Sequence, residues 1–177
     1  MAVDQNYFEL FNLPPGFDVD LAELEQAYQK IMQQVHPDRQ HKQEFQQRLA
    51  AQYTALVNDA YDCLKNPVSR AIYLAEQNGI HIDLEQSTIY DEDFLGQLML
   101  WQERLQDLSE DKNTAGLTAL DREIRSVLDR QETLFEQAYS ALRERDPGQS
   151  GQNLAPAITD AVLKMNFLYR FIKRVND

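Results

Sequence analysis

Apolar residues recur at alternating spacings of three and four along most of this 177-residue chain. That period places them on one face of an α-helix. We find no sustained alternation of Val, Ile and Thr of the kind that is typical of a β-strand. The clearest apolar stripe lies in residues 21–35 and consists of Leu21, Leu24, Tyr28, Ile31 and Val35. The chain is therefore predicted to be all-α, and its 43% apolar content is enough for a real core.

The first half is predicted to contain two long helices and two short ones. Residues 7–13 form an aromatic turn that Pro14-Pro15-Gly16 ends, and the helix at 21–35 follows with Asp18 or Asp20 as its cap. A second long helix begins near residue 43 and ends at Asn66-Pro67. A further short helix covers residues 69–77 and ends at Asn78-Gly79. The stripe of the second long helix is Phe45, Leu49, Tyr53, Leu56, Ala60 and Leu64.

The tripeptide His36-Pro37-Asp38 lies between the two long helices. Pro37 cannot sit inside a helix, and it biases His36 away from helical angles. The two helices are therefore expected to form an antiparallel hairpin that presents His36 and Asp38 at its tip. Taken alone, such a tripeptide is more often a helix stop with a cap than a functional motif, so the flanking segments must decide.

The second half is predicted to form an antiparallel three-helix bundle after a connector at residues 79–90. Its helices begin near residues 91, 117 and 155, and a Pro- and Gly-containing break at 146–151 separates the last two. Four apolar residues lie off the main stripes, at about 100–150° around their helices. They either face another helix or the first domain, or form a surface that binds a partner, and the pattern leaves both open. These residues are Leu95, Met99, Leu163 and Phe167.

Charge and composition exclude several functional classes. The formal net charge of −12, from 29 acidic and 17 basic residues, disfavours nucleic acid and anionic membranes as partners. No run of 18 apolar residues exists to span a membrane. Cys63 is the single cysteine and is expected to be a small core residue, which fits a reducing compartment such as the cytoplasm.

We expect no cofactor, metal or catalytic site. His36 and His41 lie five residues apart, and no cysteine or third histidine completes a zinc site with them, while His81 is interpreted as a connector residue. The chain has no phosphate-binding loop, so ATP binding by this chain is not expected. Its carboxylates lie on polar helix faces beside Lys and Arg, as solvated surfaces do.

Several segments together resemble a J domain. They are the aromatic turn at 7–13, the helix at 21–35, the tripeptide at 36–38, the closing segment at 66–73, and residues 57–64 with Asn58, Ala60, Tyr61 and Leu64 in the pattern of the family's third helix. The resemblance covers residues 4–78. It implies that the tripeptide binds a heat-shock ATPase chaperone beside a positive rim formed by Lys30, Arg39 and Lys42.

The run Arg-Ala-Ile-Tyr-Leu at 70–74 and the all-helical second half resemble one branch, the HscB-type J proteins of iron–sulfur cluster assembly. The absence of a Cys-x-x-Cys pair before the J domain favours the bacterial type. The resemblance implies a J domain at 1–78, a connector at 79–90 and a scaffold-binding three-helix bundle at 91–177, in an L-shaped arrangement. The implied scaffold contacts are Leu95, Met99, Glu103 and Phe167, with Leu100 where the family has an acidic residue.

The implied function is that of a monomeric co-chaperone rather than an enzyme. It would bind an iron–sulfur scaffold protein of the IscU type and deliver it to a heat-shock ATPase chaperone of the HscA or DnaK type, whose ATP hydrolysis it would stimulate. The alternatives are a general J-domain co-chaperone and a helical interaction module without an iron–sulfur role. General J proteins usually carry Gly/Phe-rich or Cys-rich regions after the J domain, and this chain has neither.

Overall fold

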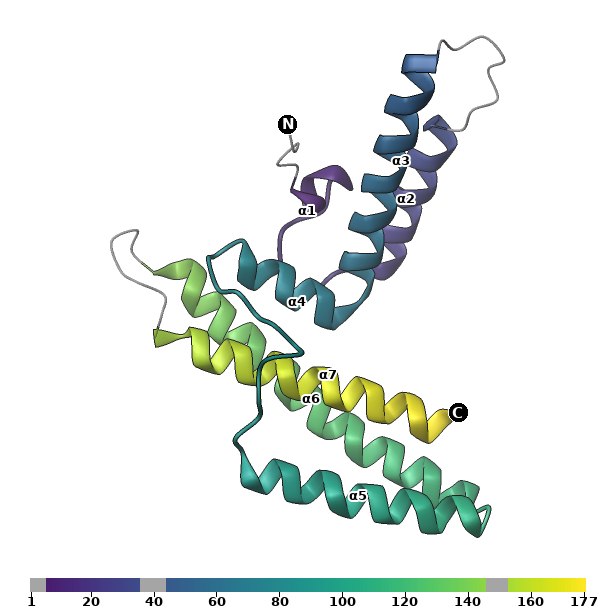
Figure 1. Cartoon of the computed structure of the whole chain (residues 1–177), viewed down its shortest axis with the longest axis vertical. Helices are drawn as coiled ribbons and strands as arrows, with labels where there is room; N and C mark the ends of the chain where they lie inside the picture. The colour runs from purple at the N-terminus through teal and green to yellow at the C-terminus, as the bar shows by residue number, and fades with distance from the viewer. Residues whose placement is uncertain (1–5, 36–43, 146–152) are drawn as a thin grey trace. The chain divides into compact units, whose positions relative to one another are not determined.

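The computed structural model describes residues 6–35, 44–145 and 153–177, and within these ranges every regular element is an α-helix (Figure 1). The all-α prediction is confirmed. The chain divides into two compact units, Met1–Leu74 and Ala75–Asp177. The predicted domain boundaries and the L-shaped arrangement stay predictions.

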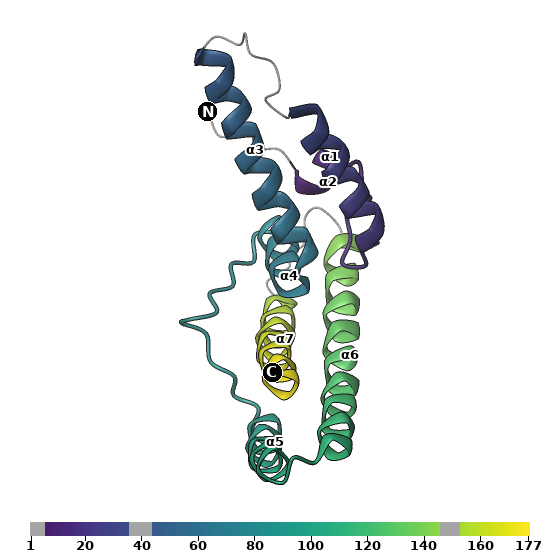
Figure 2. The same cartoon turned by 90° about the vertical axis from the view of Figure 1, so that its right-hand side faces the viewer.

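The N-terminal unit is built around an antiparallel hairpin of two long helices that lie side by side (Figures 1 and 2). Asp20 caps the first of them, because its carboxylate accepts hydrogen bonds from the backbone N–H groups of Ala22 and Glu23 at 2.8 and 3.1 Å. The helices are α1 (Tyr7–Leu10), α2 (Leu21–Val35), α3 (Glu44–Lys65) and α4 (Pro67–Glu76), the last of which crosses the boundary between the units.

Helix α4 begins two residues before the predicted start because Asn66 caps it. The Asn66 side chain accepts hydrogen bonds from the backbone of Val68 and Ser69 at 2.9 and 3.1 Å. Pro67 then occupies the first helical position, where a missing N–H costs nothing. At the other end, Gly79 adopts a left-handed φ of 76°, which ends the helical backbone as predicted.

The core of this unit lies between α1, α2 and α3. Its most buried side chains include Phe8, Leu24, Val57 and Leu64. The predicted stripes are buried only in part, because Leu21, Leu49 and Tyr53 are exposed. Cys63 is half-buried rather than a core residue, and its Sγ lies 3.6 Å from the Ser69 carbonyl oxygen.

The C-terminal unit is an antiparallel three-helix bundle, as predicted (Figure 1). Its helices are α5 (Glu92–Glu110), α6 (Thr114–Glu144) and α7 (Ala155–Asn176). Helix α6 starts earlier than its apolar stripe because Asn113 caps the Gly116 N–H at 2.9 Å. Since successive helices run in opposite directions, α5 and α7 run in the same direction.

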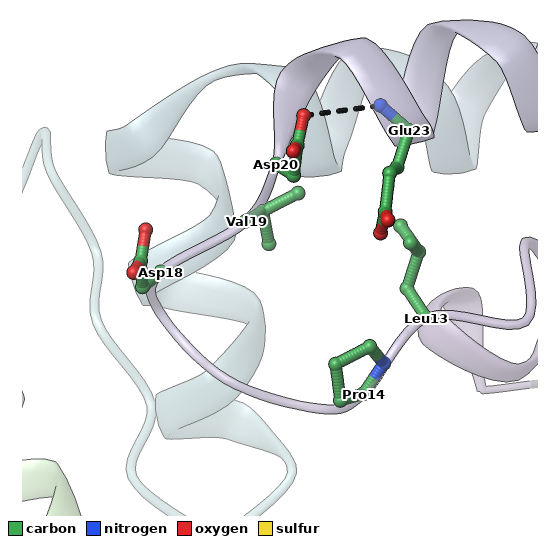
Figure 3. A pocket seen from close by; sticks show the side chains of 6 residues that line it. All are labelled: Leu13, Pro14, Asp18, Val19, Asp20 and Glu23. Atoms are coloured by element: carbon green, nitrogen blue, oxygen red, sulfur yellow. Dashed lines mark hydrogen bonds between the residues drawn. The ribbon is translucent and has the colours of Figure 1, made fainter.

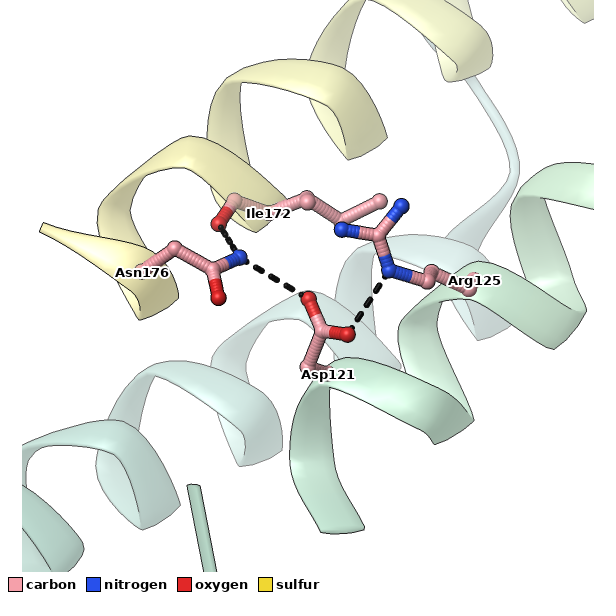
Figure 4. A network of polar contacts seen from close by, with 4 residues as sticks. All are labelled: Asp121, Arg125, Ile172 and Asn176. Carbon is pink, nitrogen blue, oxygen red and sulfur yellow. Dashed lines mark hydrogen bonds and ion pairs between the residues drawn. The ribbon is translucent and has the colours of Figure 1, made fainter. Parts of the chain in front are cut away.

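Large apolar side chains fill the bundle core, and polar contacts hold its edges. Trp101 is fully buried, packs against Phe171 with ring centroids 6.2 Å apart and donates its indole N–H to Glu123 at 2.7 Å. At the end of α7, Asn176 donates to Asp121, which also accepts from Arg125 (Figure 4). The other fully buried large residues of the bundle are Leu120, Ile124, Phe135, Leu142, Ile158, Met165 and Leu168.

Candidate functional site

Most of the predicted chaperone-binding residues lie outside the described residues. They belong to the segment 36–43 and are His36, Pro37, Asp38, Arg39 and Lys42. Lys30 is described, and it lies on α2 with an exposed side chain. These six residues therefore remain a predicted binding site.

The two helices on either side of this segment, α2 and α3, are held together by an aromatic and polar seam. The rings of Tyr28 and Tyr61 stack with centroids 4.2 Å apart, and the Tyr28 hydroxyl donates to Asn58 at 3.0 Å. The Tyr61 hydroxyl donates to Glu25, and this bond is the main cause that lowers the pKa of the Glu25 carboxyl. The Lys65 ammonium lies over the Tyr61 ring, 5.1 Å from its centroid. The seam fixes the relative position of the two helices.

The predicted apolar scaffold contacts are exposed on the bundle. The side chains of Leu95, Met99 and Phe167 are 39%, 68% and 46% exposed, and Glu103 is exposed as well. Leu100, where an acid was expected, is 57% exposed. The four apolar side chains among them therefore form exposed apolar surface on the described part of the bundle.

Leu163 behaves differently from the other three apolar residues that lie off the main stripes. Its side chain is 4% exposed, so for this residue the interpretation as internal packing is correct. A neighbouring element covers one edge of the wide apolar face of α7, whereas Phe167, one turn further on, stays half-exposed.

A buried lysine ties the start of α5 to α7. Lys164 has a side chain only 9% exposed, and its ammonium donates to Asp91 at 2.6 Å and to Asp160 at 2.8 Å. Asp91 also caps α5 by accepting from the Phe94 N–H at 3.0 Å. Burial by itself lowers the pKa of the Lys164 ammonium, but its bonds to the two carboxylates outweigh burial and the pKa is raised.

This lysine clamp lies about one helical turn before two of the exposed apolar residues. Leu95 lies four residues after Asp91 on α5, and Phe167 lies three residues after Lys164 on α7. At about 1.5 Å rise per residue, each of the two lies about one helical turn further along its own helix than the clamp residue of that helix. The sequence-based reasoning missed the clamp, although a lysine inside the apolar run of α7 with an aspartate four residues before it was a visible signal.

A surface hollow in the N-terminal unit is lined by Leu13, Pro14, Asp18, Val19, Asp20 and Glu23 (Figure 3). Asp20 is already used there as the helix cap, and the lining contains neither a nucleophile nor a histidine or cysteine. Across the described ranges, no three His, Cys, Asp or Glu side chains group as metal ligands would. None of the helices in those ranges is long and apolar enough to cross a membrane.

Comparisons with known proteins agree with both halves of the chain. A family model for the DnaJ domain matches residues 6–73, and one for the HSCB C-terminal oligomerisation domain matches residues 90–176. The co-chaperone protein HscB homolog of Shewanella baltica is 35% identical over 176 residues, which are 97% of each chain. That of Neisseria meningitidis serogroup A is 41% identical over 130 residues, which are 73% of this chain and 76% of the relative.

Solved structures show the same fold. The structure of chaperone HscB from Vibrio cholerae has a TM-score of 0.78 and 28% sequence identity, over 97% of this chain and 96% of that one. The crystal structure of human co-chaperone protein HscB has a TM-score of 0.81 and 23% identity, over 99% of this chain and 83% of that one.

Proposed function

The chain belongs to the HscB family of co-chaperones, and from this premise we propose that it couples an iron–sulfur scaffold protein to a heat-shock ATPase chaperone. It would bind the scaffold, deliver it to the chaperone and stimulate ATP hydrolysis. The observation that carries the proposal is the combination, in one chain, of a DnaJ domain with a helical bundle that exposes Leu95, Met99 and Phe167.

The J domain supplies the contact with the chaperone. His36, Pro37 and Asp38 would bind the ATPase, and the exposed Lys30 would act with Arg39 and Lys42 as a positive rim that steers association. Support comes from the α2–α3 seam, because stacked Tyr28 and Tyr61 hold together the two helices that the tripeptide connects.

The bundle supplies the contact with the scaffold. Leu95, Met99 and Phe167 would bury their exposed side chains against it, and Glu103 would take part in the polar rim. Joining both contacts on one chain converts the second binding event into an intramolecular one and raises the effective concentration of the scaffold at the chaperone.

The proposed complex contains one copy of the chain, since the exposed apolar residues of the bundle are assigned to the scaffold. Sedimentation at micromolar concentration tests this point, and a dimer that persists on dilution contradicts it. The cytoplasmic location predicted from the single cysteine stays a prediction.

The decisive experiment is single-turnover ATP hydrolysis by an HscA-type chaperone with this chain, in the presence and absence of an IscU-type scaffold. We expect stimulation that His36→Gln abolishes and that scaffold amplifies. The double variant Met99→Ala/Phe167→Ala should lose only the amplification. Leu134→Ala is the matched control, because Leu134 is an exposed apolar residue of the same bundle that the proposal does not use.

The other outcomes separate the alternatives. Stimulation that is indifferent to scaffold retains the J domain but excludes the iron–sulfur role, and the chain would then be a general J-domain co-chaperone. Unchanged stimulation by His36→Gln in a well-folded protein excludes the chaperone contact as proposed.

A further inference from the structure

The turn after α4 contains the dipeptide Asn78-Gly79, which the proposed function does not use. The Gly79 N–H donates to the Glu76 carbonyl oxygen at 2.9 Å. The Ile80 N–H donates to the Ala75 carbonyl oxygen at 3.0 Å. Together with the left-handed φ of 76° at Gly79, these bonds form a Schellman motif. The backbone of Asn78 and Gly79 is therefore held in one conformation.

An asparagine that precedes a glycine carries a chemical reactivity of its own. The asparagine side chain is one of the thermolabile groups of proteins, because the backbone nitrogen of the next residue can attack its carbonyl carbon. A Cβ on that next residue hinders the attack, and glycine has none. Asn78 is the only asparagine in this chain that is followed by glycine.

Tyr139 on α6 holds the side chain that would react. Burial raises the pKa of the Tyr139 hydroxyl, and its hydrogen bond with the Asn78 side chain acts in the opposite direction, as a bond from a donor does. The Asn78 amide nitrogen therefore donates to this hydroxyl. Tyr139 is itself fixed, because it is buried and its ring stacks on Phe135 with centroids 5.9 Å apart.

Both reacting groups are thus engaged in the folded chain. The Gly79 nitrogen, which would attack, is hydrogen-bonded through its proton to Glu76. The Asn78 amide, whose nitrogen would leave, is hydrogen-bonded to Tyr139. Because both bonds must open before the groups can react, the fold slows the reaction by the cost of opening this turn.

We propose that Asn78 is a site of spontaneous deamidation that the folded turn and the Tyr139 hydroxyl protect, so that modification follows local opening of the end of α4. In the opened chain, the Gly79 nitrogen loses its proton and forms a bond to Asn78 Cγ. The Cγ–Nδ2 bond breaks, and ammonia leaves with that proton. Water then opens the cyclic imide to an aspartate or an isoaspartate. Water is consumed and ammonia is released, and nothing is oxidised or reduced.

The product does not suit the same turn. Either product places a negative charge at the C-terminal end of α4, where the helix dipole disfavours it and where the exposed Glu76 is already acidic. An isoaspartate also lengthens the backbone by one atom and disrupts the hydrogen bonds of the Schellman motif. Residue 78 lies four residues after the boundary at Leu74, so the change falls in the segment that connects the two units.

Mass spectrometry of the full chain after incubation in mildly alkaline buffer measures the reaction. Trypsin cleavage after Arg70 and Arg104 gives a peptide in which Asn78 is the only asparagine. We expect the chain unfolded in urea to be modified at least about tenfold faster than the folded chain. Folded Tyr139→Phe should be modified about fivefold faster than the folded parent, which is the factor that one lost hydrogen bond is worth.

Two controls separate this protection from general loss of stability. Tyr169→Phe removes a hydroxyl that donates to Glu132 in the same pair of helices, and it should leave the rate at Asn78 unchanged. Gly79→Ala restores the hindering Cβ, so in urea, where neither chain has the turn, it should be modified much more slowly than the parent.

The outcomes are decisive, and neither scaffold nor chaperone is present, so failure of the proposed function leaves them unchanged. Faster modification of Tyr139→Phe than of Tyr169→Phe, with slow modification of Gly79→Ala in urea, supports the protected site. Equal rates for the folded and unfolded parent refute protection by the fold. Equal rates for the two tyrosine variants refute the role of the Tyr139 hydroxyl, and an unmodified Asn78 in urea refutes the site.

Discussion

Leu168 and Phe167 are adjacent residues on α7 whose truncation should have opposite consequences. Leu168 is fully buried in the bundle core, whereas Phe167 is half-exposed. Leu168→Ala removes three carbons, each worth about 0.8 kcal/mol on transfer from water, and leaves a cavity among close-packed neighbours. We expect the free energy of unfolding to fall by about 3 kcal/mol.

Phe167→Ala removes a larger side chain at a smaller cost. About half of the ring is already in water, and solvent can fill the space that the ring leaves, so no enclosed cavity forms. The expected loss is about 1 kcal/mol. In the proposed function, this variant nevertheless loses scaffold binding, whereas the Leu168→Ala protein binds scaffold normally under conditions in which it is folded.

Urea unfolding followed by tryptophan fluorescence measures both changes. Trp101 is the chain's single tryptophan and is buried in the same bundle, so its emission reports on that unit. With a typical m value of about 2 kcal/mol/M, the midpoint for Leu168→Ala should lie about 1.5 M below that of the parent. Equal midpoints for the two variants, or a lower midpoint for Phe167→Ala, would refute the assignment of the core.

Three further predictions concern single features of the structure. Lys164→Met should lower the free energy of unfolding by about 1–2 kcal/mol in urea titrations. The loss is no larger because Asp91 and Asp160 are partly exposed, so water can solvate their carboxylates when the ammonium is removed. Lys164→Arg keeps a positive charge between the two carboxylates and should therefore keep most of the parent's stability. An unchanged value for Lys164→Met would show that the clamp contributes nothing. Gly79→Ala forces a left-handed φ on alanine and should lower the Tm, whereas Gly96→Ala raises it, so shifts of the same sign would contradict the backbone argument. The hydrogen bonds from Arg125 to Asp121 and from Trp101 to Glu123 lower the pKa of both carboxyls. Their stabilisation is complete above the unfolded pKa of about 4 and is lost as pH falls through the lower folded pKa. Asp121→Asn/Glu123→Gln should therefore flatten the acid side of a Tm–pH curve, and a curve as steep as the parent's would disprove it.

Local sequence patterns predicted only part of the candidate site. The tripeptide His36-Pro37-Asp38 and the pattern around Asn58 indicated a J domain, and a DnaJ family model matches that region. The exposure of Met99 and Phe167 also agreed with their positions off the apolar stripes. Lys164 was missed because a charged residue normally indicates solvent, and its burial depends on two carboxylates that lie on two different helical segments.

The sequence by itself determined which segments are helical and the apolar period along each of them, and it placed the ends of some helices correctly. Helix α2 has the predicted bounds because the apolar period, the Asp20 cap and the proline after it all act within a few residues. What the sequence left open, the tertiary structure decided: Leu163 is buried and Phe167 exposed, although both lie off the stripe of the same helix. The helical period fixes the angle of a side chain on its own helix. Whether that side chain is buried depends on which neighbouring helix lies at that angle, and this is set only when distant segments pack together.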